Sequence, residues 1–249
     1  MADPAATRVA GDEACGTDAY GLRSAISPYV FRSMLVGMAA VAVGIHRTTG
    51  SRELAWRFAK ARARDLTWML GVNVTVTGRE NISGGGPFVF TPNHQSHLDI
   101  LTLLGFLPGR TRFATKQDLW RHPVVGSVLD TLGMIPIDRD HPEHAIEALN
   151  AAGAERDALV IFPEGTRSRT GRLGRFKKGA FVLAIELGRP IVPVICRGTR
   201  RLMPRGGRLH IAPGDVEIVL EAPIPTVGLT YADRNALARR VRAVIARHH

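Results

Sequence analysis

Two short segments of the sequence carry residue types that can do acid–base and anion-binding chemistry. The first contains His94 and Asp99, five positions apart, after an apolar run and at the start of a helical pattern. On a continuous helix five residues span about 500° of rotation, so the two side chains would diverge, but across a loop-to-helix junction they can converge. Asp99 can then hold one imidazole nitrogen and leave the other as a general base near neutral pH.

Two other interpretations apply to the same segment. Ser96 and Asp99 match a capping box, in which Asp99 occupies the first turn of a helix, and this role is compatible with the catalytic one. His97 lies three residues after His94 and could indicate a metal pair, but no third ligand has suitable spacing, so we expect no metal site. The chain also lacks the G-x-S-x-G motif of serine hydrolases and the phosphate-binding loop of nucleotide hydrolases.

The second segment is Phe162-Pro163-Glu164-Gly165-Thr166-Arg167-Ser168, which again follows an apolar run. Gly165 permits a tight turn, and Arg167 can grip a phosphate with two parallel hydrogen bonds. Six basic residues with no acidic one then follow within twelve positions: Arg167, Arg169, Arg172, Arg175, Lys177 and Lys178. This arrangement favours an anion-binding site over a simple solvated surface.

Together these blocks resemble a known family, the glycerolipid acyltransferases of the 1-acyl-sn-glycerol-3-phosphate acyltransferase type. The resemblance extends over about residues 72–200 and includes further blocks in the expected order. These are Lys116-Gln117-Asp118-Leu119, where Asp118 replaces the usual Glu, then Gly133–Arg139, Phe176–Phe181 and Ile191–Val194. These ordered blocks together make a much more specific signal than the His94–Asp99 motif alone.

The resemblance implies transfer of a fatty acyl group from acyl-CoA or acyl carrier protein to the sn-2 hydroxyl of 1-acyl-glycerol-3-phosphate. The product is phosphatidic acid, a precursor in phospholipid biosynthesis, and the reaction uses no cofactor. His94 and Asp99 are then catalytic, and the substrate-binding residues are Lys116, Arg139, Glu164, Gly165, Thr166 and Arg167. Arg139 and Arg167 would hold the acceptor phosphate, although Arg139 could instead pair with Asp138 or Asp140. Backbone N–H groups around Gly165, or Lys116, could stabilise the oxyanion.

Two alternatives remain at this stage. One is a sister acyltransferase with another acceptor, such as glycerol-3-phosphate, a different lysophospholipid or a glycolipid. The other is a non-catalytic basic protein that binds membranes or nucleic acid. The second explains the net charge of +11 but not the His94, Asp99, Glu164 and Arg167 constellation. Aromatic residues make up only 6% of the chain, so we do not expect nucleic acid as a partner. The acyl chain length and the oligomeric state stay open.

The elements that must position these residues follow an α/β pattern after Gly71. Apolar runs predict strands at Val72–Thr77, Phe88–Thr91, Arg112–Thr115, Met134–Ile137, Leu159–Phe162, Ile191–Cys196 and Val216–Leu220. Helical patterns cover Ile100–Phe106, Ala145–Ala154, Ala180–Leu187 and Tyr231–Arg247. Strands that alternate with helices predict a mostly parallel sheet flanked by helices.

The N-terminal part differs in composition from the rest of the 249 residues. Residues 1–27 read as a flexible leader with a net charge of −2, and residues 28–70 carry +5. Residues 71–249 form the predicted acyltransferase domain, and the positive charge returns over residues 161–249, which carry +11.

Residues 28–70 predict a pair of helices. The apolar run Met34–Ile45 is too short to span a bilayer, and Ser51–Leu70 reads as a basic amphipathic helix. We therefore expect peripheral or monotopic attachment to the cytoplasmic face of a membrane. The alternative is an ordinary helical hairpin packed on the core.

Overall fold

The computed structural model describes residues 17–137, 147, 156–204 and 211–248. All seven predicted strands are present, each within two residues of its predicted ends. They are β1 Val72–Thr77, β2 Val89–Pro92, β3 Thr111–Lys116, β4 Ile135–Ile137, β5 Ala158–Val160, β6 Ile191–Arg197 and β7 Gly214–Leu220. The helix predicted over Ala145–Ala154 and the candidate Arg139 lie outside the described residues.

The strands form one sheet in the order β1-β7-β6-β2-β5-β3-β4. The pairs β6–β2, β2–β5, β5–β3 and β3–β4 are parallel. β7 pairs antiparallel with β6 and parallel with β1, so β1 and β7 run against the other five strands. The mostly parallel sheet predicted from the sequence is therefore confirmed. Its parallel part brings the ends of β2, β3, β4 and β5 to one edge, where open α/β sheets bind their ligands.

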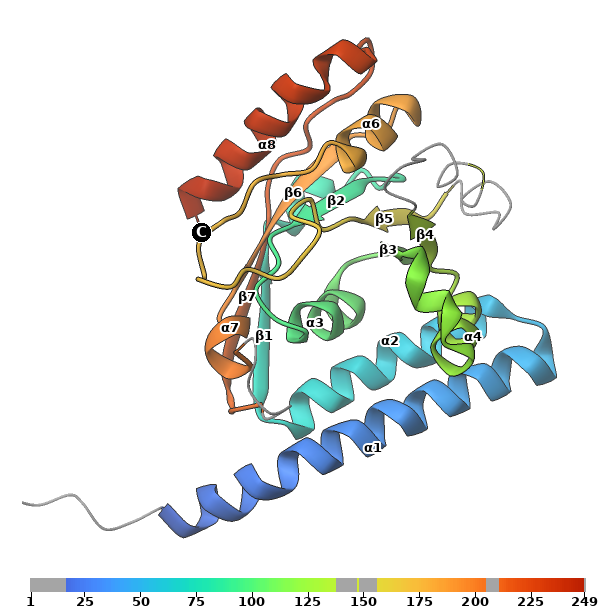
Figure 1. Ribbon diagram of the computed structural model, residues 1–249, viewed down its shortest axis with the longest axis vertical. Coiled ribbons are helices and arrows are strands. Elements are labelled where there is room, and N and C mark those ends of the chain that lie inside the picture. Colours follow the sequence, from blue (N-terminus) through green and yellow to red (C-terminus); the bar gives the residue numbers. More distant parts are fainter. Residues whose placement is uncertain (1–16, 138–146, 148–155, 205–210, 249) are drawn as a thin grey trace, which may run out of the picture.

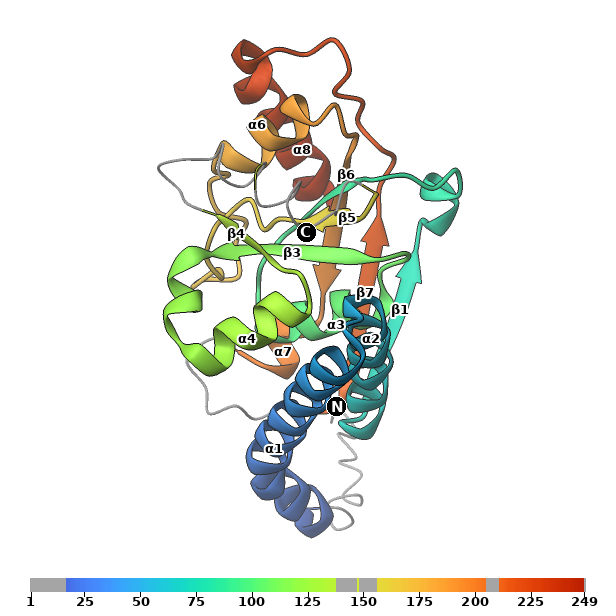
Figure 2. The ribbon, with the colours of Figure 1, turned by 90° about the vertical axis from the view of Figure 1, so that its right-hand side faces the viewer.

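Helices cover both faces of the sheet (Figure 1). The helices are α1 Thr17–Thr49, α2 Arg52–Met69, α3 Leu98–Phe106, α4 Pro123–Thr131, α6 Gly179–Glu186, α7 Thr199–Leu202 and α8 Arg234–His248. α2 and α3 pack on one face, with α1 outside α2, whereas α6 and α8 pack on the other. Figure 2 shows α1 and α2 side by side below the sheet.

Residues of β6 alternate between the two cores, as the pleat of a strand requires. Val192 and Val194 belong to the core beneath α2 and α3, which also buries Trp56. Ile191 and Ile195 belong to the core beneath α6 and α8. The central strands are thus apolar on both faces, which is why they read in the sequence as continuous apolar runs.

The N-terminal helices differ in one boundary from the prediction. Ser51 is the N-cap of α2, and its side chain accepts a hydrogen bond from the Leu54 N–H, so the predicted start of this helix is confirmed. α1, however, begins at Thr17, ten residues inside the segment predicted as a leader that ends at residue 27. Residues such as Ala19, Leu22 and Ala25 have good helix propensity and continue the helix backwards. Within the part of the chain that the structure describes, no helix has the length and apolar character needed to cross a membrane.

Candidate active site

His94 and Asp99 meet at the junction between β2 and α3. The loop between Pro92 and Leu98 turns the chain so that His94 Nδ1 lies 2.8 Å from Asp99 Oδ2. The Asp99 carboxylate is fully buried, whereas the His94 ring retains 12% of its exposure. The ring stacks on Phe162, with 3.9 Å between the ring centroids. Nδ1 is therefore held by the carboxylate, and Nε2 is the nitrogen left for a substrate.

The backbone around His94 fixes the Asp99 carboxylate. Its Oδ2 atom accepts hydrogen bonds from the N–H groups of Gln95 at 2.7 Å and Ser96 at 2.8 Å, in addition to His94. Only half of the predicted capping box forms, because the Ser96 hydroxyl accepts from Leu98 N–H and donates to the Met203 carbonyl. The same oxygen of Asp99 thus accepts hydrogen bonds from the backbone at the start of α3 and contacts the imidazole of His94.

Glu164 joins the two sequence motifs. Its Oε1 accepts from the backbone N–H of His94, and its Oε2 accepts from the N–H of Gly174, both at 2.9 Å. The carbonyl of His94 in turn accepts from the N–H of Ser168 at 2.8 Å. The loop after β5 is therefore clamped onto the loop after β2. Glu164 is buried and does not line the cavity described next, so its contacts are those of a positioning residue rather than a substrate ligand.

A cavity of about 990 Å³ opens beside the His94 ring, at the carboxyl ends of β2, β3, β4 and β5. Its apolar lining includes Phe113, Met134, Ile137, Phe162 and Leu183. Five of the predicted site residues also line it: His94, Lys116, Gly165, Thr166 and Arg167. Asp99 and Glu164 lie behind this lining. The cavity thus combines an apolar interior, a histidine held by a carboxylate and cations, which suits an amphipathic anionic substrate.

Gly165 shapes the turn that carries Arg167. Its φ of +66° lies in the left-handed region, which favours glycine. Its N–H donates to the carbonyl of Phe162 at 3.0 Å and closes the turn. The Gly165 N–H is therefore engaged inside the turn, while Thr166, Arg167 and Lys116 also line the cavity, so both kinds of oxyanion donor considered from the sequence lie at its wall.

The basic loop between Arg167 and Lys178 is anchored at several points. Arg242 on α8 donates to the carbonyls of Leu173 and Gly174, each at 3.2 Å. Arg200 on α7 donates to the carbonyl of Arg169 at 3.1 Å. These arginines use their guanidinium groups to hold backbone carbonyls. Part of the positive charge of the C-terminal third is therefore structural.

Comparison with known proteins identifies the family. The family model described as Acyltransferase matches residues 73–197, half of the chain. The 1-acyl-sn-glycerol-3-phosphate acyltransferase alpha of Homo sapiens is 30% identical over 216 residues, which cover 85% of this chain and 76% of the human protein. This chain belongs to the acyltransferase family.

Other acyltransferases extend the comparison. A 1-acyl-sn-glycerol-3-phosphate acyltransferase of Saccharomyces cerevisiae is 35% identical over 86% of this chain and 75% of its own length. A chloroplastic one from Brassica napus is 40% identical over 60% of this chain, and the match spans 44% of that protein, less than half its length. The crystal structure of the 1-acyl-sn-glycerophosphate acyltransferase PlsC from Thermotoga maritima superposes with a TM-score of 0.72 at 28% identity. That superposition covers 92% of this chain and 94% of PlsC.

Some residues of this acyltransferase site were missed from the sequence. The side chain of Asn93 pairs with the backbone of Cys196, donating to its carbonyl at 3.0 Å and accepting from its N–H at 2.7 Å. The Asn93 side chain therefore continues the hydrogen bonding between β2 and β6 beyond the end of β2. Arg175, Lys177 and Lys178 line the cavity, although the sequence showed only that basic residues crowd there. Their closeness in sequence to the turn at Glu164 was the one feature that could have predicted this position.

His97 has no contact with the cavity of the acyltransferase. Burial lowers the pKa of its imidazole, and the nearby charges of Arg167 and His94 lower it further. Among the described residues, no three His, Cys, Asp or Glu side chains gather in a way that could hold a metal ion.

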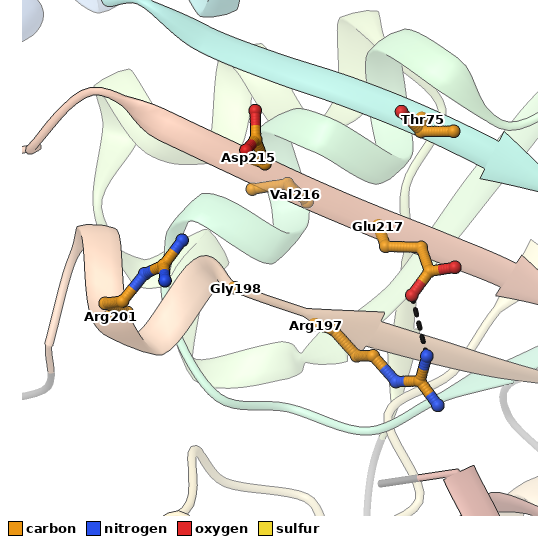
Figure 3. Close-up of a pocket in the computed structure, with 7 residues that line it drawn as sticks. All are labelled: Thr75, Arg197, Gly198, Arg201, Asp215, Val216 and Glu217. Atoms are coloured by element: carbon orange, nitrogen blue, oxygen red, sulfur yellow. Dashed lines mark hydrogen bonds and ion pairs between the residues drawn. The ribbon is translucent and has the colours of Figure 1, made fainter.

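A smaller hollow of about 580 Å³ lies on the β1–β7–β6 side of the acyltransferase sheet, away from His94 (Figure 3). Figure 3 shows Arg197 of β6 paired with Glu217 of β7 at 2.7 Å, with Asp215 and Arg201 along the same wall. The lining contains two arginines and two carboxylates, so this hollow is balanced in charge. None of the predicted site residues lines it.

Proposed function

We propose that this protein transfers a fatty acyl group from a thioester to the sn-2 hydroxyl of 1-acyl-glycerol-3-phosphate and so forms phosphatidic acid. One observation supports this above the others. The His94–Asp99 pair borders a cavity that is apolar inside and lined by Lys116 and Arg167. An acceptor with one acyl chain and one phosphate matches both parts of that lining. The relatives named 1-acyl-sn-glycerol-3-phosphate acyltransferase support the same acceptor.

In the proposed reaction the acceptor attacks the thioester directly. His94 Nε2 takes the proton of the sn-2 hydroxyl as its oxygen bonds to the carbonyl carbon, and Asp99 stabilises the imidazolium that forms. The tetrahedral intermediate then collapses, the carbon–sulfur bond breaks, and the leaving thiolate receives the proton from His94. The products are the ester and a free thiol, and no nucleophile of the protein is consumed. We expect the base to contribute roughly 10²–10⁴ in rate.

The remaining predicted site residues have separate roles in binding the acceptor. Lys116 ends β3 and Arg167 follows the Gly165 turn, so they approach the cavity from two different loops. We propose that they bind the acceptor phosphate, together with Arg139. Gly165 and Thr166 shape the turn beneath this phosphate, and Glu164 holds the turn in place. The acyl donor, acyl-CoA or acyl carrier protein, enters as a substrate and no resident cofactor takes part.

A panel of acceptors tests the proposed function. Purified protein is given oleoyl-CoA with lysophosphatidate, glycerol-3-phosphate or lysophosphatidylcholine, and thiol release and product mass are measured. We expect phosphatidic acid as the main product. A preference for glycerol-3-phosphate would instead identify a sister acyltransferase. His94→Ala should lose activity by at least about 10², whereas His97→Ala, three residues away and outside the cavity lining, is the matched control and should retain it.

We further propose that α1 and α2 attach the protein to the cytoplasmic face of a membrane. Apolar side chains are exposed on both helices: Val36 at 67%, Val41 at 49%, Trp68 at 79% and Met69 at 57%. Exposed apolar residues on an outer helix mark a contact with another apolar phase. Nearby Arg residues, including Arg32, Arg47 and Arg57, suit an acidic lipid surface.

Vesicle binding tests this attachment without disturbing the core. α2 buries Trp56 and Leu66 in the main core, so deleting both helices would unfold the protein rather than simply release it. Val36→Asp with Val41→Asp changes only exposed positions and should reduce sedimentation with phosphatidylglycerol vesicles. Val227→Asp is a matched control, because Val227 is 82% exposed in the segment between β7 and α8. Equal sedimentation of the two variants would contradict the attachment.

A further inference from the structure

Three cations lie in the cavity beyond those needed for the acceptor. Arg175, Lys177 and Lys178 occupy the segment that leads into α6, and all three line the same cavity as Lys116 and Arg167. The described lining contains these five cations and no aspartate or glutamate. All three are exposed at the cavity wall, so their charges are accessible to a ligand.

The smaller hollow shows no such excess of charge. The hollow on the opposite part of the sheet matches two arginines with two carboxylates, as Figure 3 shows for Arg197 and Glu217. In the described lining of the cavity, by contrast, five cations face no aspartate or glutamate, and Lys178 stands at the N-cap of α6, where positive charge is unfavourable to the helix. A bound anion would relieve both costs.

The cations separate into two groups along the chain. Arg167 follows the Gly165 turn in the loop after β5, whereas Arg175, Lys177 and Lys178 belong to the segment that leads into α6. The side chain of Lys177 lies over Gly165, with its Nζ 3.4 Å from where a Cβ on that glycine would be. From there Lys178 leads into α6, whose Ala180, Val182 and Leu183 add apolar lining. The second group therefore places cations directly beside an apolar wall.

The acceptor carries a single phosphate, which Lys116 and Arg167 can neutralise. The other substrate of an acyl transfer is a thioester, and biological acyl thioesters are carried on a pantetheine arm that ends in a phosphate. We propose that Arg175, Lys177 and Lys178 form a donor subsite that binds the phosphate of this arm, with the acyl chain along the apolar wall of α6. This inference rests on the proposed acyl transfer and adds the place and chemistry of donor binding.

Donors with and without the phosphate test the subsite. Oleoyl-CoA, oleoyl-4′-phosphopantetheine and oleoyl-pantetheine are compared on wild type and on Arg175→Ala with Lys178→Ala, with lysophosphatidate as acceptor. We expect the double variant to lose about tenfold to a hundredfold in kcat/KM with the two phosphorylated donors, since hydrogen bonds to charged groups are involved. With oleoyl-pantetheine the loss should be less than about twofold, and the KM for lysophosphatidate should not change.

Arg172→Ala is the matched control for this experiment. Arg172 belongs to the same basic run and is exposed, but it does not line the cavity, so its removal should leave every donor unaffected. An equal loss with all three donors in the double variant would overturn the subsite, because the effect would not depend on phosphate. A rise in the KM for lysophosphatidate alone would also overturn it and assign the cations to the acceptor.

Two further experiments distinguish the two donor carriers and test the subsite separately from the proposed function. If the double variant loses as much kcat/KM with oleoyl-acyl carrier protein as with oleoyl-4′-phosphopantetheine, the subsite binds the arm of either carrier. A loss of kcat/KM confined to oleoyl-CoA would overturn a phosphopantetheine subsite. Calorimetry with coenzyme A alone needs no turnover. If wild type turned over no acceptor, the proposed function would fail, yet weaker coenzyme A binding by the double variant would still support the subsite, and equal binding would overturn it.

Discussion

The carboxylate of Glu164 accepts a hydrogen bond from the backbone N–H of His94 at 2.9 Å, and its other oxygen accepts one from Gly174. A single buried side chain thus holds His94 against the loop that carries Arg167. The loop is far from His94 in sequence, so in the proposed reaction this contact determines whether the base and the phosphate ligand act on one molecule.

Glu164→Gln should lower kcat while the protein stays folded. The amide keeps one acceptor, but its NH₂ group faces a backbone N–H, and leaving that buried donor unpaired costs about 1–3 kcal/mol. We expect kcat to fall about tenfold to a hundredfold, measured by thiol release at saturating substrates. Glu186→Gln, at an exposed position on α6, is the control and should behave as wild type. A folded Glu164→Gln variant with unchanged kcat would exclude the positioning role.

Asn93→Ala should destabilise the protein. The substitution leaves the N–H and C=O of Cys196 without their side-chain partner at a buried position, which we expect to cost about 2–4 kcal/mol in the free energy of unfolding. Urea denaturation measures this change. Asn73→Ala on the edge strand β1 removes only an exposed hydrogen bond to Asp215 and should cost less than about 1 kcal/mol. Equal losses for the two variants would show that Asn93 does not support the ladder.

The Cys196 thiol should be inert in the native protein. Burial raises its pKa well above the usual value, and the nearby Asp99 charge raises it further, so the reactive thiolate is scarce. In a Cys15→Ser background, a disulfide-exchange reagent should label no thiol in buffer and one thiol in denaturant. Rapid labelling in buffer would mean that the region between β6 and Asp99 opens. Slow labelling also means that in the Cys15→Ser background thiol-release assays report only the product of acyl transfer.

Lys60 should make the stability depend on alkaline pH. Its ammonium donates to the carbonyls of Leu107 and Gly109, and burial, with Arg64 and Arg79 nearby, lowers its pKa to about 8. Between about pH 8 and the unfolded value of 10.5, the unfolded chain binds the extra proton, so the contribution of Lys60 to stability rises with pH.

The comparison of wild type with Lys60→Met isolates this effect. The difference in unfolding free energy between the two should shift in favour of wild type from pH 7.5 to pH 10, by about 1 kcal/mol after allowance for solvent screening of this half-buried group. Urea titrations at both pH values supply the measurement. A difference that stays constant would show that Lys60 titrates alike in both states.

The sequence predicted the elements better than their arrangement. Each strand is a short apolar run bounded by turn residues, so β1 to β7 were found within two residues of their ends. The reversal of β1 and β7 could not be predicted, because it depends on pairing between segments far apart in the chain. α4 was missed since it is only nine residues long, begins at Pro123 and exposes Val124 and Val125.

The candidate site shows the same division. The spacing of His94 and Asp99 was sufficient to predict that they converge, because both lie within one short loop and the following turn. The partners of Glu164 were not predictable, since they are backbone N–H groups brought together only when two loops dock. Lys177 was visible as a charge, but its position over Gly165 follows from a left-handed turn.

β7 lies between β1 and β6, and this position has a consequence for synthesis of the chain. Asn73 and Asp215 sit opposite each other in the β1–β7 pair although 142 residues separate them. β1 therefore has no strand to pair with until residues 214–220 have left the ribosome. During that interval its edge is open and the sheet is incomplete, a state prone to aggregation. α1 and α2 leave the ribosome well before β7 does, so if they attach the protein to a membrane as proposed, the growing chain can bind lipid while its sheet is still unfinished.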